Sequence, residues 1–166
     1  DDCDPVATCT NTDGGWTWEP QLSNTQAWLY DVQFVDASTG WACGENGSIL
    51  KTVDAGANWF VQQSGTALGL RKICFTDAAT GWGVGDMGLI IHTGDGGMSW
   101  NTQSPGTADT LESVFFLNES RGWVCGQNGL IAHTLDGGSS WSLQESGSTE
   151  WLYDIQFSDN NNGWAC

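Results

Sequence analysis

Hydrophobic and polar positions alternate in short runs along this chain, and the runs return every 41 residues. Residues 29–34 (LYDVQF) alternate as a half-buried strand, and residues 40–44 follow as a second strand. Residues 45–47 (ENG) suit a hairpin turn, because Asn and Gly tolerate a left-handed backbone. Residues 48–52 and 59–63 then continue as the third and fourth strands. The pattern predicts four short antiparallel strands per unit and no long helix.

Two independent series of tryptophans fix the length of the unit. The constant step means that every unit has the same strand and loop lengths, and a blade of this kind buries its faces only against its neighbours. We therefore expect an all-β fold, a β-propeller of four blades with four strands each. A β-solenoid is the alternative, but its coils are shorter and contain fewer hairpin turns. Both series advance by 41 residues, one in Gly-Trp pairs (Trp41, Trp82, Trp123, Trp164) and one at Trp18, Trp59, Trp100 and Trp141.

The phase of the repeat bears on how the propeller is completed. Residues 147–166 hold the first two strands of a unit, and residues 1–23 hold a turn and the last two strands of one. Three arrangements fit this phase. The two segments can pair within one chain and close a ring, or pair between successive chains and form a filament. Alternatively, the sequence is a fragment of a longer propeller whose other strands are not included. We divide the single repeat domain 1–166 into units of about 24–64, 65–105, 106–146, and 147–166 completed by 1–23.

The charge of the chain is strongly negative. Twenty acidic residues against four basic ones give a formal net charge of −16. Nucleic acids and anionic membrane surfaces are poor partners for such a chain, because both are bound through clustered Lys and Arg. No apolar run reaches the length of a membrane span and no signal peptide remains, so we expect no membrane insertion. The acidic surface and the cysteines favour a secreted or cell-surface protein of bacterial type.

The six cysteines favour disulfides over a metal. They form no CxxC pair and the chain has two His, which argues against zinc. Cys43, Cys125 and Cys166 share one repeat position, where we expect small buried residues or half-bridges. Cys3 and Cys9 lie outside the repeat and are candidates to bridge to each other or to Cys166. We expect no metal and no cofactor.

A turn motif recurs in every unit and carries a family resemblance. Residues 52–59, 93–100 and 134–141 match (Ser/Thr)-x-Asp-x-Gly-x-x-Trp, and residues 11–18 differ only by an initial Asn. This is the Asp-box, or bacterial neuraminidase repeat, and the chain most resembles the photosystem II stability and assembly factor repeats found in bacterial secreted proteins. We assign the box a folding role, since Asp accepts backbone N–H groups and Trp anchors the turn. The structural positions are Asp13, Gly15, Trp18, Asp54, Gly56, Trp59, Asp95, Gly97, Trp100, Asp136, Gly138 and Trp141.

The resemblance implies no enzyme activity. Sialidases with this box use three arginines to hold the substrate carboxylate, and this chain has only Arg71 and Arg121. Photosystem assembly factors have more blades and a basic binding patch, which this acidic chain lacks. Glycoside hydrolases with the box place paired acids between two large propellers, which 166 residues cannot build. We therefore expect no catalytic residues.

Two hypotheses about function follow. The first is a non-catalytic extracellular structural or interaction module that binds itself through complementary terminal strands, in a filament, or binds another extracellular protein. The alternative is a glycan-binding propeller, because aromatic residues vary at the entry to the first strand while the framework tryptophans do not. The simpler interpretation of these aromatic residues is packing at the seam between the first and last units. The candidate ligand rim consists of Trp28, Tyr30, Arg71, Trp151 and Tyr153.

Overall fold

A computed structural model describes residues 6–12 and 15–166, and its regular structure is almost entirely β. Three four-stranded antiparallel sheets, which we call blades 1, 2 and 3, each run in chain order from the first strand to the fourth. Blade 1 is β3 (Leu29–Phe34), β4 (Gly40–Gly44), β5 (Ile49–Thr52) and β6 (Phe60–Gln62). Blade 2 is β7 (Leu70–Phe75), β8 (Gly81–Gly85), β9 (Ile90–Thr93) and β10 (Asn101–Gln103). Blade 3 is β11 (Leu111–Phe116), β12 (Gly122–Gly126), β13 (Ile131–Thr134) and β14 (Ser142–Gln144).

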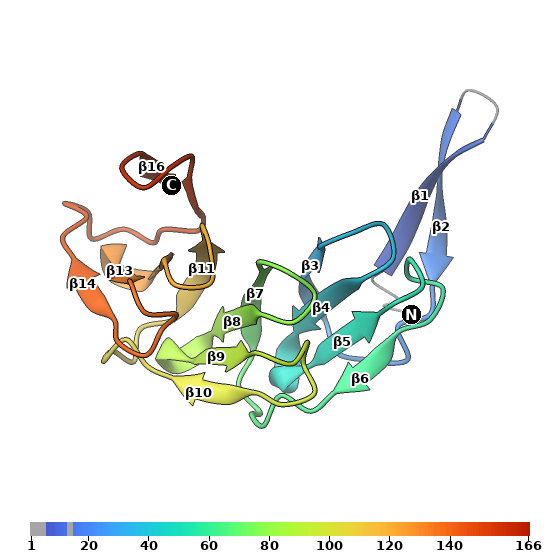
Figure 1. Ribbon diagram of the computed structural model, residues 1–166, viewed down its shortest axis with the longest axis horizontal. Coiled ribbons are helices and arrows are strands. Elements are labelled where there is room, and N and C mark those ends of the chain that lie inside the picture. Colours follow the sequence, from blue (N-terminus) through green and yellow to red (C-terminus); the bar gives the residue numbers. More distant parts are fainter. Residues whose placement is uncertain (1–5, 13–14) are drawn as a thin grey trace.

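Two hairpins flank the blades. The N-terminal hairpin pairs β1 (Val6–Thr12) with β2 (Gly15–Gln21), and the C-terminal hairpin pairs β15 (Ile155–Phe157) with β16 (Gly163–Ala165). The blades follow one another along an arc, with one hairpin at each end of it (Figure 1). Each hairpin is a separate two-stranded sheet. The predicted propeller blades are confirmed, but the ring is open, because in the described part of the chain β15 and β16 form no sheet with β1 and β2.

The turn between the second and third strands forms as the sequence predicts. A single turn of 3₁₀ helix occupies η1 (Glu45–Gly47), η2 (Asp86–Gly88) and η3 (Gln127–Gly129). Its central residue has a left-handed backbone in each blade, with φ of 55° at Asn46 and 57° at Met87. Asn adopts this conformation at little cost, whereas it is uncommon for Met.

Stacked aromatic rings join each blade to the next. The indole of Trp41 in blade 1 lies flat on Phe75 of blade 2, with ring centroids 3.7 Å apart. Trp100 of blade 2 meets the same Phe75 edge-on at 6.0 Å. Such pairs add to the large apolar area that each ring buries. The same stack recurs between Trp82 and Phe116 at 3.5 Å and between Trp123 and Phe157 at 3.7 Å.

Asp-box backbone atoms complete the contact between blades. The indole N–H of Trp41 donates to the Gly96 carbonyl oxygen of the next blade at 3.2 Å. Lys51 donates to the same oxygen at 2.9 Å and lies over the Trp41 ring. In the next pair of blades, Trp82 donates to the Gly137 carbonyl oxygen at 3.1 Å. Blades 1 and 2 are therefore each held by the Asp-box turn of the next blade as well as by its phenylalanine.

Replacing Trp82 by Ala should strongly destabilise the array. Trp82 is fully buried, and its loss removes both the Phe116 stack and a partly buried hydrogen bond. Large buried aromatic side chains cost about 3–5 kcal/mol when truncated. Chemical unfolding monitored by circular dichroism measures the loss. Trp164→Ala is the matched control, because Trp164 has the same repeat position but is 67% exposed, and an equal loss in both variants would contradict the role given to the stack.

Candidate functional site

The Asp-box carboxylates are used within their own turns. In blade 2, Asp95 accepts hydrogen bonds from the Thr93 hydroxyl at 2.8 Å and from the backbone N–H and hydroxyl of Ser99 at 2.9 and 2.6 Å. The Thr93 hydroxyl in turn accepts the N–H of Gly97 at 2.9 Å. These bonds lower the pKa of Asp95 to about 2, because they favour its charged form. The box in blade 2 is a closed hydrogen-bonded unit.

The boxes of blades 1 and 3 have the same bonds. Asp54 accepts from Thr52 and Asn58, and Asp136 accepts from Thr134 and Ser140. The side-chain hydrogen bonds of Asn58 and Ser140 are the main cause of a lowered pKa at each carboxyl. A carboxyl that stays ionised at neutral pH cannot serve as a general acid there. The geometry agrees with the folding role that the sequence assigns to the three boxes.

The fourth copy of the motif differs. Asp13 lies outside the described residues, and Gly15 and Trp18 lie in β2, which pairs with β1 up to the partners Thr12 and Gly15. Trp18 is 69% exposed, whereas Trp59 is buried. In the sequence, Asn11 stands at the position of the threonine whose hydroxyl links Asp and Gly in the other boxes.

The candidate ligand rim consists of two separate aromatic groups. Tyr30 stacks under the guanidinium of Arg71, 5.2 Å from the ring centroid, and donates to Glu45. Arg71 also pairs with Asp86 at 2.9 Å. Trp151 and Tyr153 stack on each other at 6.1 Å near the C-terminal hairpin. Among the described residues no ring contact joins the second group to the first.

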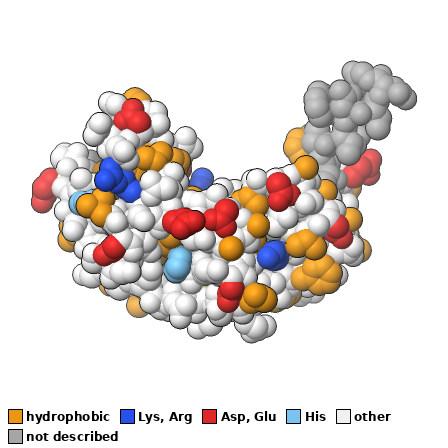
Figure 2. Space-filling view, viewed as in Figure 1, with side chains coloured by type: hydrophobic (Ala, Val, Ile, Leu, Met, Phe, Trp, Pro, Cys, Tyr) orange, Lys and Arg blue, Asp and Glu red, His pale blue; other side chains and the backbone are white. Residues whose placement is uncertain are grey.

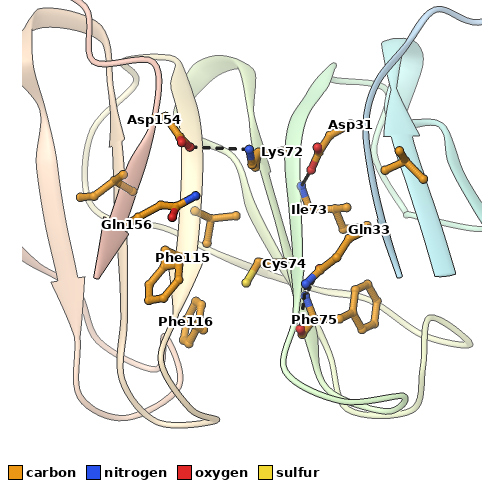
Figure 3. Close-up of a pocket in the computed structure, with 13 residues that line it drawn as sticks. Asp31, Gln33, Lys72, Ile73, Cys74, Phe75, Phe115, Phe116, Asp154 and Gln156 are labelled. Atoms are coloured by element: carbon orange, nitrogen blue, oxygen red, sulfur yellow. Dashed lines mark hydrogen bonds and ion pairs between the residues drawn. The ribbon is translucent and has the colours of Figure 1, made fainter. Parts of the chain in front are cut away.

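The first strands of the blades line a pocket of about 330 Å³ on the inner side of the arc (Figure 3). Its polar side chains mostly link neighbouring blades. Asp31 of blade 1 accepts the N–H of Ile73 at 3.0 Å, and Gln33 bonds both the N–H and the carbonyl oxygen of Phe75. Lys72 of blade 2 reaches Asp154 at 3.6 Å. The pocket therefore combines exposed strand backbone with side chains that already have partners.

The described thiols are free. Cys43 and Cys125 are buried. The Cys43 sulfur lies 3.6 Å from the carbonyl oxygen of Leu70, which begins β7, and the Cys125 sulfur lies 3.5 Å from that of Leu152, which precedes β15. Burial raises the pKa of both thiols, that of Cys125 to about 12. The structure thus makes them small buried residues, one of the two sequence expectations. Cys166 is exposed and unbridged, so the expected clasp is not formed, while Cys3 and the side chain of Cys9 lie outside the described atoms.

Two repeated residues that link the blades escaped the sequence analysis. The phenylalanine that ends the first strand recurs at Phe34, Phe75, Phe116 and Phe157, and a glutamine at the end of the fourth strand recurs at Gln21, Gln62, Gln103 and Gln144. Gln21 accepts the indole N–H of Trp59 at 3.1 Å, and Gln103 donates to the Gly137 carbonyl oxygen at 3.1 Å. The 41-residue step was the available signal for both.

Figure 2 shows the crescent face with acidic and hydrophobic side chains dispersed over all blades. The described residues include no group of three or more His, Cys, Asp or Glu placed to hold a metal ion. They also include no helix of the length and apolar character needed to cross a membrane. The four-stranded blades and the hydrogen-bonded Asp-boxes place the chain in a class of protein, the Asp-box β-propellers.

The chain belongs to the family described as photosynthesis system II assembly factor YCF48, whose model matches residues 10–100 and 62–146. No curated protein matches it. Among solved structures, it is similar to YCF48 bound to D1 peptide, at 24% identity and a TM-score of 0.70, over 81% of this chain and 44% of that one. It is also similar to an ancestral GH74 enzyme, at 15% identity and a TM-score of 0.68, over 89% of this chain and 23% of the enzyme.

A third similar structure is YCF48 from Cyanidioschyzon merolae, at 16% identity and a TM-score of 0.52, over 97% of this chain and 71% of that one. At these identities the likeness establishes the blade fold. This chain spans less than half the length of the first two structures. The family resemblance predicted from the Asp-box and Gly-Trp repeats is confirmed.

Acid should weaken the array through its boxes. The folded-state pKa of Asp95 lies near 2, below the ordinary value of 3.8, so its stabilising effect is complete above the ordinary value and is lost as pH falls toward 2. Asp54 and Asp136 shift in the same direction. Urea midpoints measured between pH 7 and pH 2 should therefore fall with pH. Asp95→Asn should lower the midpoint at pH 7 and converge with the parent near pH 2.

Glu119→Gln is the control for this pH series, because Glu119 is an exposed carboxylate in a turn of blade 3. It should leave the pH profile unchanged. A profile for Asp95→Asn that runs parallel to the parent at every pH would contradict the role of the box carboxylates.

Proposed function

We propose that this chain is a non-catalytic extracellular interaction module that joins further propeller units through its terminal hairpins, so that copies add head to tail in a filament. One observation carries the proposal. The second strands β4, β8 and β12 each pair on both sides, whereas β16 pairs only with β15. An unpaired strand edge is a template for strand addition.

The two hairpins supply complementary halves of a blade. β15 and β16 correspond to the first and second strands of a blade, and β1 and β2 occupy the places of the third and fourth strands that precede blade 1. Addition of β1 and β2 from a second copy to the free edge of β16 would complete a four-stranded sheet. Heterologous contacts of this kind build open filaments when the rotation does not close.

A non-catalytic role is supported by the use of the repeated carboxylates. Asp54, Asp95 and Asp136 are committed to bonds within their turns. Lys72 and Asp154 pair with each other across the inner pocket. The similarity to a GH74 enzyme rests on 15% identity and concerns the blade fold.

A polypeptide is the class of partner that the comparisons favour, because the similar YCF48 structure has a D1 peptide bound. A second copy of this chain is a partner of that class. The extracellular assignment rests on the acidic composition, with a formal net charge of −16. Such a charge keeps a protein soluble outside the cell and disfavours contact with nucleic acids.

Assembly can be tested directly with the purified chain. Sedimentation velocity and electron microscopy over a concentration series should show species that grow with concentration and become fibres. Higher salt should promote assembly, because screening weakens repulsion between copies that each carry −16. A sharp monomer at millimolar concentration and 0.5 M salt, about 4 Å in Debye length, would overturn the proposal.

Glycan binding is a second candidate, favoured by the exposure of the rim aromatics. Trp28 and Tyr153 are largely exposed, and Trp151 and Tyr153 present a stacked pair to solvent. Exposed aromatic faces of this kind are suited to stacking against sugar rings. On a glycan array the chain should bind a restricted set of sugars, and Trp28→Ala or Trp151→Ala should abolish the signal. Met98→Ala, an exposed residue away from the rim, is the control, and an array without hits removes this candidate.

A further inference from the structure

Side chains of β3 close the seam between blades 1 and 2 on its inner side. Asp31 accepts the backbone N–H of Ile73 at 3.0 Å. The Gln33 amide accepts the N–H of Phe75 and donates to the Phe75 carbonyl oxygen at 3.1 Å. These backbone groups point away from β8, which pairs with the other edge of β7. Gln33 therefore supplies to Phe75 the donor and the acceptor that a peptide group of a further strand would supply.

Blade 2 carries different residues at the same two positions. Lys72 and Cys74 follow Asp31 and Gln33 by one repeat of 41 residues. An ammonium group has only donors and cannot accept an N–H, and Lys72 pairs with Asp154 at 3.6 Å. The thiol of Cys74 is a weak hydrogen-bonding group, and its side chain lacks the carboxamide that ends Gln33. The inner side of the seam between blades 2 and 3 is therefore not closed as the first seam is.

Two backbone positions of β11 lack the corresponding partners. Val114 and Phe116 are the repeat counterparts of Ile73 and Phe75. Within the described residues, no side-chain oxygen or nitrogen bonds to them, and the Cys74 thiol is the group that meets the Phe116 N–H. Both residues are buried, at 3% and 6% exposure, and buried backbone groups are nearly always paired in folded proteins. The hydrogen bonding of this strand edge is therefore incomplete.

The edge of β11 borders the inner pocket, whose volume is about 330 Å³. Cys74 points from β7 toward β11 (Figure 3) and is partly exposed. In the next seam, the ring of Phe115 stands at the repeat position of Cys74 and stacks on Phe157 at 6.3 Å. Ser113 of that seam accepts the N–H of Ile155 at 3.4 Å. The seam at Cys74 thus has neither an amide nor a ring at this position.

The charge of the pocket favours a neutral ligand group. Its charged lining residues are two carboxylates, Asp31 and Asp154, and the ammonium of Lys72. A ligand carboxylate would meet this excess of negative charge, and an apolar side chain would leave the backbone groups unpaired. A carboxamide has both a donor and an acceptor and carries no charge. It is therefore the side-chain group that suits this edge of β11.

We infer that the space bounded by Cys74, Val114 and Phe116, the Cys74 notch, binds the carboxamide of an Asn or Gln side chain of a polypeptide partner. The bound amide accepts the Phe116 N–H and donates to the Phe116 carbonyl oxygen, as Gln33 does at Phe75. A carbonyl oxygen of the same segment accepts the Val114 N–H. The inference rests on the polypeptide class of partner given in the proposed function, and it does not require that copies assemble.

Nuclear magnetic resonance can detect this contact with small probes. The probes are the N-acetyl methylamides of glutamine, glutamate and alanine, which share one backbone and differ in the side chain. The glutamine probe should shift the backbone N–H signals of Val114 and Phe116 in a saturable way. The other two should bind at least about tenfold more weakly, because each leaves a buried polar group unpaired. The signals of Ile73 and Phe75, which already have partners, should not move. Equal shifts with all three probes would overturn the inference.

Exchanging the two repeat positions tests the same contact from within the chain. Cys74→Gln should place the chain's own amide in the notch, abolish the shifts caused by the glutamine probe and raise the urea midpoint. Gln33→Cys should lower the midpoint and open an equivalent notch, so that the probe also shifts the Phe75 signal. Met98→Gln adds the same amide at a position that is 79% exposed and should bind the probe like the parent.

A Cys74→Gln variant that gives a dispersed amide spectrum and still binds the probe contradicts the inference. Gln33→Cys keeps the test decisive if Cys74→Gln does not fold, because an unshifted Phe75 signal in that variant also contradicts it.

The outcomes separate this inference from the proposed assembly. If sedimentation shows assembly while the glutamine probe leaves Val114 and Phe116 unshifted, the notch is wrong and the assembly stands. If the probe binds in the notch of a chain that stays monomeric at every concentration, the assembly fails and the inference stands.

Discussion

The contact between a tryptophan of one blade and a phenylalanine of the next is the interaction on which this structure depends. A four-stranded sheet with 18 strand residues cannot bury both faces alone, so a blade is stable only between neighbours. The stack of Trp41 on Phe75 buries two large rings at once and places the indole N–H beside the Gly96 carbonyl oxygen of the next turn. One orientation of the Trp41 indole therefore provides both the ring stack and the hydrogen bond between the two blades.

The Asp-box makes that geometry repeatable. Its carboxylate ties the turn to itself through Thr93 and Ser99, which leaves the Gly96 carbonyl oxygen free to accept from the preceding blade. The hydrogen bonds of the box are local, but they affect the contact between blades. The bonded turn holds the Gly96 carbonyl oxygen where Trp41 and Lys51 of the preceding blade can donate to it. The carboxylates of Asp54, Asp95 and Asp136 are all bonded within their own turns.

The internal faces of the blades are occupied by neighbouring blades, so a partner can reach the inner pocket and the outer rim. In the pocket, the polar side chains of Asp31, Gln33 and Lys72 already bond across the array. At the rim, Trp28 and Tyr153 are largely exposed.

The sequence by itself determined the strands, the turns and the length of the unit, because alternation, Asn-Gly turns and the 41-residue step are local or periodic signals. It also predicted turns stabilised by Asp54, Asp95 and Asp136, because the bonds of these carboxylates stay within a few residues. Only the tertiary structure showed the Trp-on-Phe stack, the buried free thiols and the open arc. Partners 34 residues apart, such as Trp41 and Phe75, are set by the rotation between blades, and no local pattern contains that rotation.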